Sequence, residues 1–285
     1  MRLTDRADGT HVTKAPTVRL FMPYLLPRRG DAVVYFEQKI DTGPAQAYLA
    51  RWNAGARPPL RFFHLYVAAA VRVLDERPRL NRFVAGRRLY QRNDIAISIS
   101  VIKARNDDAK LSVVKQVFTG RESLAEIRDR TETIITNGRT PQKTASEREV
   151  SQVYRLPRWV IPLLPKLQKL GDWLNLTPAS LARNDPLYAS LMISNLGSIG
   201  LDAAYHHLYE HGTLPIFAVM GKERDEPVVT PEREIVIRPI VTVRYSFDER
   251  IADGYYAARS LDRLQELLEN PWLMERPEDT GPGAP

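Results

Sequence analysis

Apolar positions recur along this chain with two different periods, and these periods predict both strands and helices. Between Ile95 and Val101 every second residue is a large aliphatic one, which predicts a strand with one apolar face. Residues 60–74 are apolar almost throughout and contain no helix breaker, so they predict a buried helix. The other predicted strands are 33–40, 87–90, 111–118, 191–195, 215–220, 234–237 and 240–247, and the other predicted helices are 44–53, 123–135 and 254–268.

Helices and strands are interleaved in this order, which indicates an α/β or α+β fold. The strands 234–237 and 240–247 are interpreted as a hairpin. Residues 1–15 are polar and are predicted to be a flexible tail, and residues 276–285, rich in Pro and Gly, to be disordered. The composition changes between residues 140 and 187, so we expect one domain over 16–275 that carries an insertion there.

The insertion contains a leucine stripe at helical spacing, accompanied by lysines and tryptophans. Such a stripe usually packs on its own domain or covers a channel mouth, and we favour these interpretations. A membrane-surface helix has a similar composition, but membrane association is not expected. The residues are Leu163, Leu167, Leu170 and Leu174, with Lys166, Lys169, Trp159 and Trp173.

Composition excludes some chemistry. The chain of 285 residues has no cysteine, which rules out disulfides, a thiolate nucleophile and cysteine-ligated metal. Its formal net charge of +7 comes from scattered basic residues without a long basic run, so nucleic-acid binding is not expected, whereas a phosphate-rich ligand suits it. The charged N-terminus and the absence of a long apolar run lead us to expect a cytoplasmic protein.

Two stretches carry candidate chemistry. Residues 190–200 read Ser-Leu-Met-Ile-Ser-Asn-Leu-Gly-Ser-Ile-Gly, and residues 245–254 read Tyr-Ser-Phe-Asp-Glu-Arg-Ile-Ala-Asp-Gly. Together they resemble the catalytic core of the dihydrolipoamide acyltransferases of 2-oxo acid dehydrogenase complexes, in which an Ile-Ser-Asn-Leu-Gly strand precedes a Phe-Asp-His-Arg-x-x-Asp-Gly turn. The resemblance extends over roughly residues 16–275, interrupted around 140–187. It implies a two-layer sandwich of the chloramphenicol acetyltransferase type, with a mixed sheet, helices on one face and a homotrimer whose sites lie between subunits.

The resemblance also implies roles for individual residues. Ser194 would donate a hydrogen bond to the oxyanion of the tetrahedral intermediate, and Asp253 would hold the loop that carries the base. Asn195 and Gly197 would line the channel for the acyl or pantetheine group. Relatives keep a histidine as the general base, and this chain has Glu249 in that position. The implied substrate is coenzyme A or an acyl thioester of it, with no metal and no lipoyl group on this chain. A separate lipoyl-bearing or acyl-acceptor protein is a possible partner, and we expect a free trimer rather than a large cage.

The glutamate changes the expected chemistry. An ordinary glutamate has a pKa near about 4.3, against about 6.5 for histidine and about 8.5 for a thiol, so it is a weak base for this purpose. Loss of a general base typically costs about 10²–10⁴-fold in rate. Two interpretations follow: an acyltransferase of altered mechanism that transfers acyl groups between coenzyme A and a thiol or another acceptor, or a catalytically inactive trimeric binding or scaffold protein.

Simpler roles compete with each assignment. An ion pair of Glu249 with Arg250 or Arg29 is slightly favoured over a catalytic role, and a structural role for Asp253 is favoured over a chemical one. Ser194 could be an ordinary strand serine, although its motif favours the site. The cluster His206, His207 and His211 lacks the further ligands of a metal site. These histidines are expected at a surface or interface, with a base supplied from another direction as the alternative.

Overall fold

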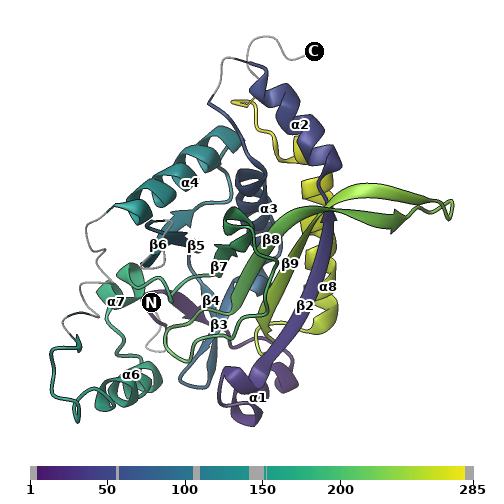
Figure 1. Ribbon diagram of the computed structural model, residues 1–285. Coiled ribbons are helices and arrows are strands. Elements are labelled where there is room, and N and C mark those ends of the chain that lie inside the picture. The colour runs from purple at the N-terminus through teal and green to yellow at the C-terminus, as the bar shows by residue number, and fades with distance from the viewer. Residues whose placement is uncertain (1–4, 56–57, 105–109, 141–150, 152, 280–285) are drawn as a thin grey trace.

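A computed structural model describes residues 5–55, 58–104, 110–140, 151 and 153–279. Six strands form the central sheet in the order β2-β9-β8-β7-β5-β6, and β7 runs parallel to both of its neighbours while the other pairs are antiparallel (Figure 1). A smaller sheet has the order β1-β4-β3. The strands are β1 (Gly9–His11), β2 (Val33–Asp41), β3 (Arg82–Ala85), β4 (Arg88–Arg92), β5 (Ile95–Ile102), β6 (Leu111–Phe118), β7 (Leu191–Asn195), β8 (Ile216–Val229) and β9 (Ile235–Asp248).

Helices α3, α4 and α8 cover one face of the large sheet. Helix α3 is buried along most of its length because its residues are apolar on every side, whereas α8 buries only one stripe that includes Ala257, Leu264 and Leu268. The predicted mixed sheet with a helical layer on one face is therefore confirmed. The helices are α1 (Thr17–Leu25), α2 (Gly43–Asn53), α3 (Phe62–Glu76), α4 (Leu124–Arg139), α6 (Leu163–Leu174), α7 (Ala179–Asn184) and α8 (Gly254–Glu269).

Strand β5 lies between β7 and the edge strand β6, and its side chains alternate between the two faces of the sheet as the period-two pattern predicts. Its large aliphatic residues point into the main core under the helices, and Ala96 between them packs in a second apolar cluster on the opposite face. That second cluster includes Met192, Phe217 and Leu214. Both faces of the central strands are thus buried, as is usual where parallel strands occur.

The predicted hairpin of 234–237 with 240–247 is wrong, because these residues form the single strand β9. Strand β9 pairs with β8, and the two continue beyond the body as a projecting ribbon (Figure 1). Pro239 lies inside β9 and suggested a break. It lies just past the end of the β2–β9 ladder, which stops at Asp41 and Ile240, and there it only accepts: the Thr42 N–H donates to the Pro239 carbonyl at 2.9 Å.

The predicted flexible tail over residues 1–15 is also wrong for the residues that the structure describes. Strand β1 pairs with β4, and the buried Arg6 guanidinium bonds Asp8 at 2.9 Å and Asp172 at 2.8 Å. Asp172 lies so far along the chain that local polarity could not reveal the pairing. Residues 1–4 lie outside the described residues.

The second predicted tail, 276–285, is ordered at least as far as Asp279. The buried Asp279 carboxylate accepts hydrogen bonds from the backbone N–H groups of Leu124 at 2.9 Å and Ala125 at 3.1 Å, at the start of α4. An aspartate at this position satisfies N–H groups that have no partner inside the helix. Residues 280–285 lie outside the described residues.

The leucine stripe of α6 does not pack on its own domain. Leu167 is 61% exposed and Leu170 is 51% exposed, so the expectation of a packed stripe is wrong for this chain. Prolines delay the helix, which begins only after Pro162. None of the described helices is long and apolar enough to cross a membrane.

Candidate functional site

Ser194 lies near the carboxyl end of β7, in register with Ser100 on β5 and with Val219 on β8. Parallel strands bring their carboxyl ends to one edge of a sheet, which is a common position for ligand sites. Ser194 and Asn195 line an open pocket of about 510 Å³ at this edge. The structure therefore places the predicted oxyanion donor beside a space that a ligand can enter.

The residues after Ser194 are held by local contacts. The Asn195 side chain accepts a hydrogen bond from the backbone N–H of Ser198 at 3.1 Å, and the Ser198 hydroxyl donates to the Asn195 carbonyl at 2.8 Å. These bonds cap a short 3₁₀ turn, η3 (Leu196–Ile199). Asn195 lines the pocket and also shapes the turn.

Gly197 is not among the residues that line this pocket. A Cβ atom at Gly197 would lie 2.5 Å from the carbonyl oxygen of Gly221, so the turn can approach β8 this closely only if a glycine stands here. Gly221 lies where the β8–β9 register shifts. The contact sets the position of the turn relative to the sheet and thereby the wall of the pocket.

The pocket also has a cationic rim. Arg61, Lys103 and Arg139 line it, and Arg61 makes an exposed ion pair with Glu132 at 3.3 Å. Three basic side chains from three separate segments around one opening favour an anionic ligand. This grouping has no local signature in the sequence, because the three residues come together only in the fold.

His64 is a pocket residue that sequence reasoning missed. Its Nε2 lies 3.1 Å from a Glu132 carboxylate oxygen, and its Nδ1 accepts a hydrogen bond from the backbone N–H of Arg61 at 3.2 Å. Burial lowers the pKa of His64, against the opposing effect of Glu132. Because both ring nitrogens are engaged, the ring serves to fix the start of α3 and is not available as a general base.

Glu249 lies in the turn that follows β9. Its backbone N–H donates to the Ala32 carbonyl at 3.0 Å, and its carbonyl accepts a hydrogen bond from the Arg19 guanidinium. The side chain is partly exposed. The backbone of this turn is thus held from two directions, while the side chain is only partly covered.

The preceding residue, Asp248, makes the ion pairs that were considered for Glu249. Arg250 bonds both carboxylate oxygens of Asp248, at 2.8 Å and 2.7 Å, and the Arg29 Nε lies 3.7 Å from the same carboxylate. All three side chains are buried. Burial lowers the pKa of Arg29, an effect that the charge of Asp248 opposes. The interpretation of Glu249 as the partner of these arginines is therefore wrong, since Asp248 fills that role.

Asp253 is the N-cap of α8. Its carboxylate accepts a hydrogen bond from the backbone N–H of Tyr256 at 2.8 Å. This cap fixes the direction in which the chain leaves the Glu249 turn and enters α8. The geometry matches the favoured structural role of a loop-holding carboxylate.

Ser194 and Glu249 lie far apart within one chain. Ser194 is in register with Val219 on β8, which pairs with Arg244 on β9, and Glu249 follows five residues later. Five residues of strand span about 17 Å, and two strand spacings add about 10 Å sideways, so the two positions are separated by roughly 20 Å. One chain alone does not bring them together.

Within the histidine cluster, His211 does not supply a free base. The two nitrogens of His211 lie within hydrogen-bonding distance of Gln168 and of Asp185, so both are engaged. His206 stacks on Phe217 with ring centroids 4.1 Å apart. Within the part of the chain that the structure describes, no group of three or more His, Asp or Glu residues is arranged to hold a metal ion.

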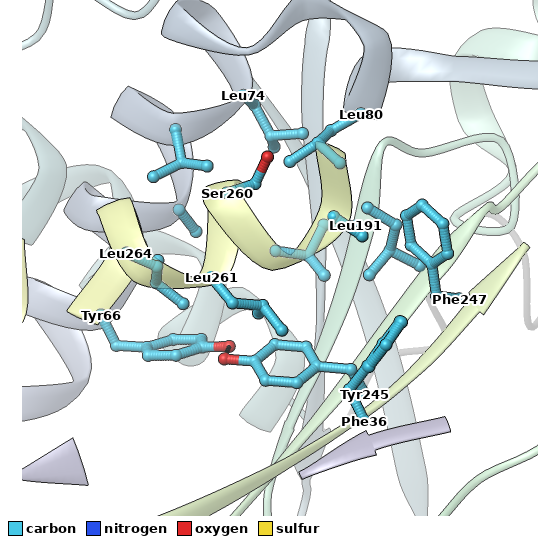
Figure 2. A pocket seen from close by; sticks show the side chains of 14 residues that line it. Phe36, Tyr66, Leu74, Leu80, Leu191, Tyr245, Phe247, Ser260, Leu261 and Leu264 are labelled. Carbon is cyan, nitrogen blue, oxygen red and sulfur yellow. Dashed lines mark hydrogen bonds between the residues drawn. The ribbon is translucent and has the colours of Figure 1, made fainter. Parts of the chain in front are cut away.

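A second, smaller cavity of about 60 Å³ lies between α3, α8 and the sheet (Figure 2). Its lining is apolar except for Ser260 and the phenols of Tyr66 and Tyr245, whose hydroxyl groups are 3.2 Å apart and hydrogen-bonded. Burial raises the pKa of both phenols. The cavity belongs to the core rather than to a site of chemistry.

The architecture defines the class of protein. The chain has the fold of the dihydrolipoamide acetyltransferase of Azotobacter vinelandii, with a TM-score of 0.61 at 19% identity over 92% of this chain and 93% of that one. It also has the fold of a chloramphenicol acetyltransferase, with a TM-score of 0.51 at 10% identity over 91% and 99% of the two chains. These likenesses place the chain in the chloramphenicol acetyltransferase-like fold class.

Sequence comparison finds similarity to one family over part of the chain. Residues 177–275 match the family described as 2-oxoacid dehydrogenases acyltransferase (catalytic domain), and this region contains both Ser194 and Glu249. The lipoamide acyltransferase component of the branched-chain alpha-keto acid dehydrogenase complex of Bacillus subtilis is 24% identical over 213 residues, which is 74% of this chain and 39% of that protein. The dihydrolipoyllysine-residue acetyltransferase component of the pyruvate dehydrogenase complex of the same species is 33% identical over 87 residues, which is 30% of this chain and 19% of that protein. The chain thus spans two fifths or less of the length of these relatives.

Proposed function

We propose that this protein transfers an acyl group between coenzyme A and a thiol or another acceptor, at a site formed between two subunits of a homotrimer. The observation that carries the proposal is the placement of the two motif halves. Ser194 faces an open pocket at one edge of the sheet, and Glu249 is held on a rigid turn roughly 20 Å away in the same chain. Two halves that cannot meet within a chain can form one site only when a second subunit supplies the missing half.

The residues fit the steps of thioester exchange. The acceptor thiol loses its proton as its sulfur attacks the thioester carbonyl carbon, and the carbonyl oxygen becomes an oxyanion. Ser194 would stabilise that oxyanion by a hydrogen bond, and collapse of the intermediate would break the bond to the coenzyme A sulfur, which then takes up the proton. Removal of one oxyanion donor typically costs about 10²–10³-fold in kcat.

The cationic rim supports a polyanionic substrate. Arg61, Lys103 and Arg139 surround the same opening as Ser194. Coenzyme A carries phosphate groups, and basic side chains around a concave opening raise the local concentration of such a ligand. Thioester exchange by these groups requires no metal.

Whether Glu249 can act as a base decides whether this protein is an active acyltransferase or an inactive relative. Its carboxylate would have to accept a thiol proton or act through another acceptor, and His64 and His211 do not replace it because their ring nitrogens are already engaged. This observation favours one alternative specifically: a trimer that binds coenzyme A or an acylated partner without turnover. For the active enzyme and for the inactive trimer alike, the proposed protein partner is one that bears a lipoyl group.

The test is an assay of thiol release from acetyl-coenzyme A, with dihydrolipoamide as acceptor, for the wild-type protein and for Ser194→Ala and Glu249→His. If the proposal holds, the wild type turns over and Ser194→Ala is slower by about 10²–10³-fold. Turnover that appears only in Glu249→His, together with acetyl-coenzyme A binding by the wild type, establishes the inactive alternative. If no variant binds or turns over acetyl-coenzyme A, both the active and the inactive interpretation are wrong.

A further inference from the structure

Helix α6 contacts the rest of the domain through its polar side. The Gln168 side chain donates to the Tyr188 hydroxyl at 2.7 Å, and the Asp172 carboxylate accepts from Arg6 at 2.8 Å. At the end of the helix the Arg88 guanidinium donates to the Trp173 carbonyl at 3.3 Å. These contacts hold the helix in one orientation and leave its opposite side facing solvent.

The side that faces solvent is the apolar one. This is the reverse of an ordinary amphipathic helix, which buries its apolar stripe and exposes its polar residues. No residue of α6 is buried. The exposed residues of this outward stripe are Leu163 at 41%, Leu167 at 61%, Leu170 at 51%, Trp173 at 54% and Leu174 at 48%.

The segment leading into α6 extends the apolar surface. Trp159 is 73% exposed, Tyr154 is 81% exposed and Leu156 is 39% exposed. A cluster of large exposed side chains of this kind is unusual on a protein surface and indicates an interaction site. We call the surface formed by the α6 stripe and residues 153–162 the α6 surface.

The charge around the α6 surface distinguishes between the partners that it could bind. Residues 153–184 contain five basic residues and a single acidic one, and that acid, Asp172, points inward to Arg6. A two-fold contact, in which this surface meets the same surface of a second copy, would place these basic residues against one another, which is unfavourable. The basic residues are Arg155, Arg158, Lys166, Lys169 and Arg183.

We propose that the α6 surface docks on the face of an anionic lipid bilayer, with its leucines and tryptophans inserted at the level of the head groups. Leucine and tryptophan side chains flanked by Lys and Arg are the composition of helices that lie in a membrane interface. The bilayer offers apolar depth for the stripe and phosphates for the surrounding cations, two features that the surface requires together. Because the helix is already anchored, binding does not have to order it first.

Sedimentation with large unilamellar vesicles tests this proposal. The wild-type protein should bind vesicles of phosphatidylcholine with one third phosphatidylserine and bind pure phosphatidylcholine vesicles much more weakly. The double variant Lys166→Gln/Lys169→Gln should weaken binding to the anionic vesicles by roughly 30-fold per chain, from about 1 kcal/mol for each basic residue near such a surface. The fluorescence of the wild type should shift to shorter wavelength on binding, and that shift should shrink in Trp173→Phe.

Leu167→Glu/Leu170→Glu should abolish binding, while Leu273→Glu, an equally exposed leucine outside the α6 surface (49%), should leave it unchanged. Circular dichroism checks that the variants fold. If the leucine variant does not fold, the lysine variant still tests the proposal. Absence of wild-type binding to anionic vesicles overturns the proposal. So does a change of sedimentation coefficient in the leucine variant without vesicles, since it would identify a protein interface. Neither result bears on acyl transfer.

Discussion

The carboxylate of Asp248 should be one of the most sensitive positions in this protein. It is 1% exposed and bonds both nitrogens of the Arg250 fork, while Arg250 itself is 3% exposed. Replacing Asp248 by asparagine preserves the shape of the side chain and removes the negative charge. Arg250 then remains buried without a counter-ion, and Arg29 loses its charged neighbour as well.

The expected cost is about 3–5 kcal/mol of the free energy of unfolding, the range for removing one partner of a buried ion pair. The matched control is Glu76→Gln. Glu76 is bonded by two nitrogens of Arg263 at 2.8 Å and 3.0 Å, so the geometry is similarly forked, but the side chains are 40% and 31% exposed. Exposed pairs contribute less than about 1 kcal/mol because water screens them.

Urea unfolding followed by far-ultraviolet circular dichroism measures both costs at one protein concentration, since an oligomer makes the apparent stability depend on concentration. The m-values of the variants should agree with that of the wild type, so that the midpoints report stability. Equal losses of stability for Asp248→Asn and Glu76→Gln would refute the argument, because burial would then not determine the cost.

Two further predictions each concern one residue. Gly197→Ala brings a methyl group within 2.5 Å of the Gly221 carbonyl oxygen. It should therefore destabilise the fold by about 1–3 kcal/mol in the same unfolding assay, and it should also weaken acetyl-coenzyme A binding. Unchanged stability would show that the turn moves freely. Burial lowers the pKa of Lys115 to about 8, below the roughly 10.4 of an unfolded lysine. The unfolded state then binds the proton first as pH falls, so the contribution of Lys115 to stability should rise between pH 8 and about 10.4 and be lowest below pH 8. A stability difference between the wild type and Lys115→Met that stays constant across this window would contradict this prediction.

Local patterns of this sequence determined much of the fold. The alternation in β5, the uniformly apolar α3 and the leucine spacing of α8 each report a preference that operates within a few residues, because strands and helices have fixed periods. The same holds for the Ser123–Glu126 spacing that opens α4, where the serine side chain accepts from Glu126 N–H and the glutamate side chain from Ser123 N–H. The two motifs that carry Ser194 and Glu249 were also readable, since motif residues are contiguous.

Only the tertiary structure decided which distant side chains meet. The ordered first strand depends on the pairing of Arg6 with Asp172, and the cationic rim gathers residues from three segments. Neither has a local signature, because ion pairs act across space and not along the chain. The outward orientation of the α6 stripe belongs to the same class: spacing shows that a helix has an apolar side, but the side that faces the domain is selected by the partners of Gln168 and Asp172.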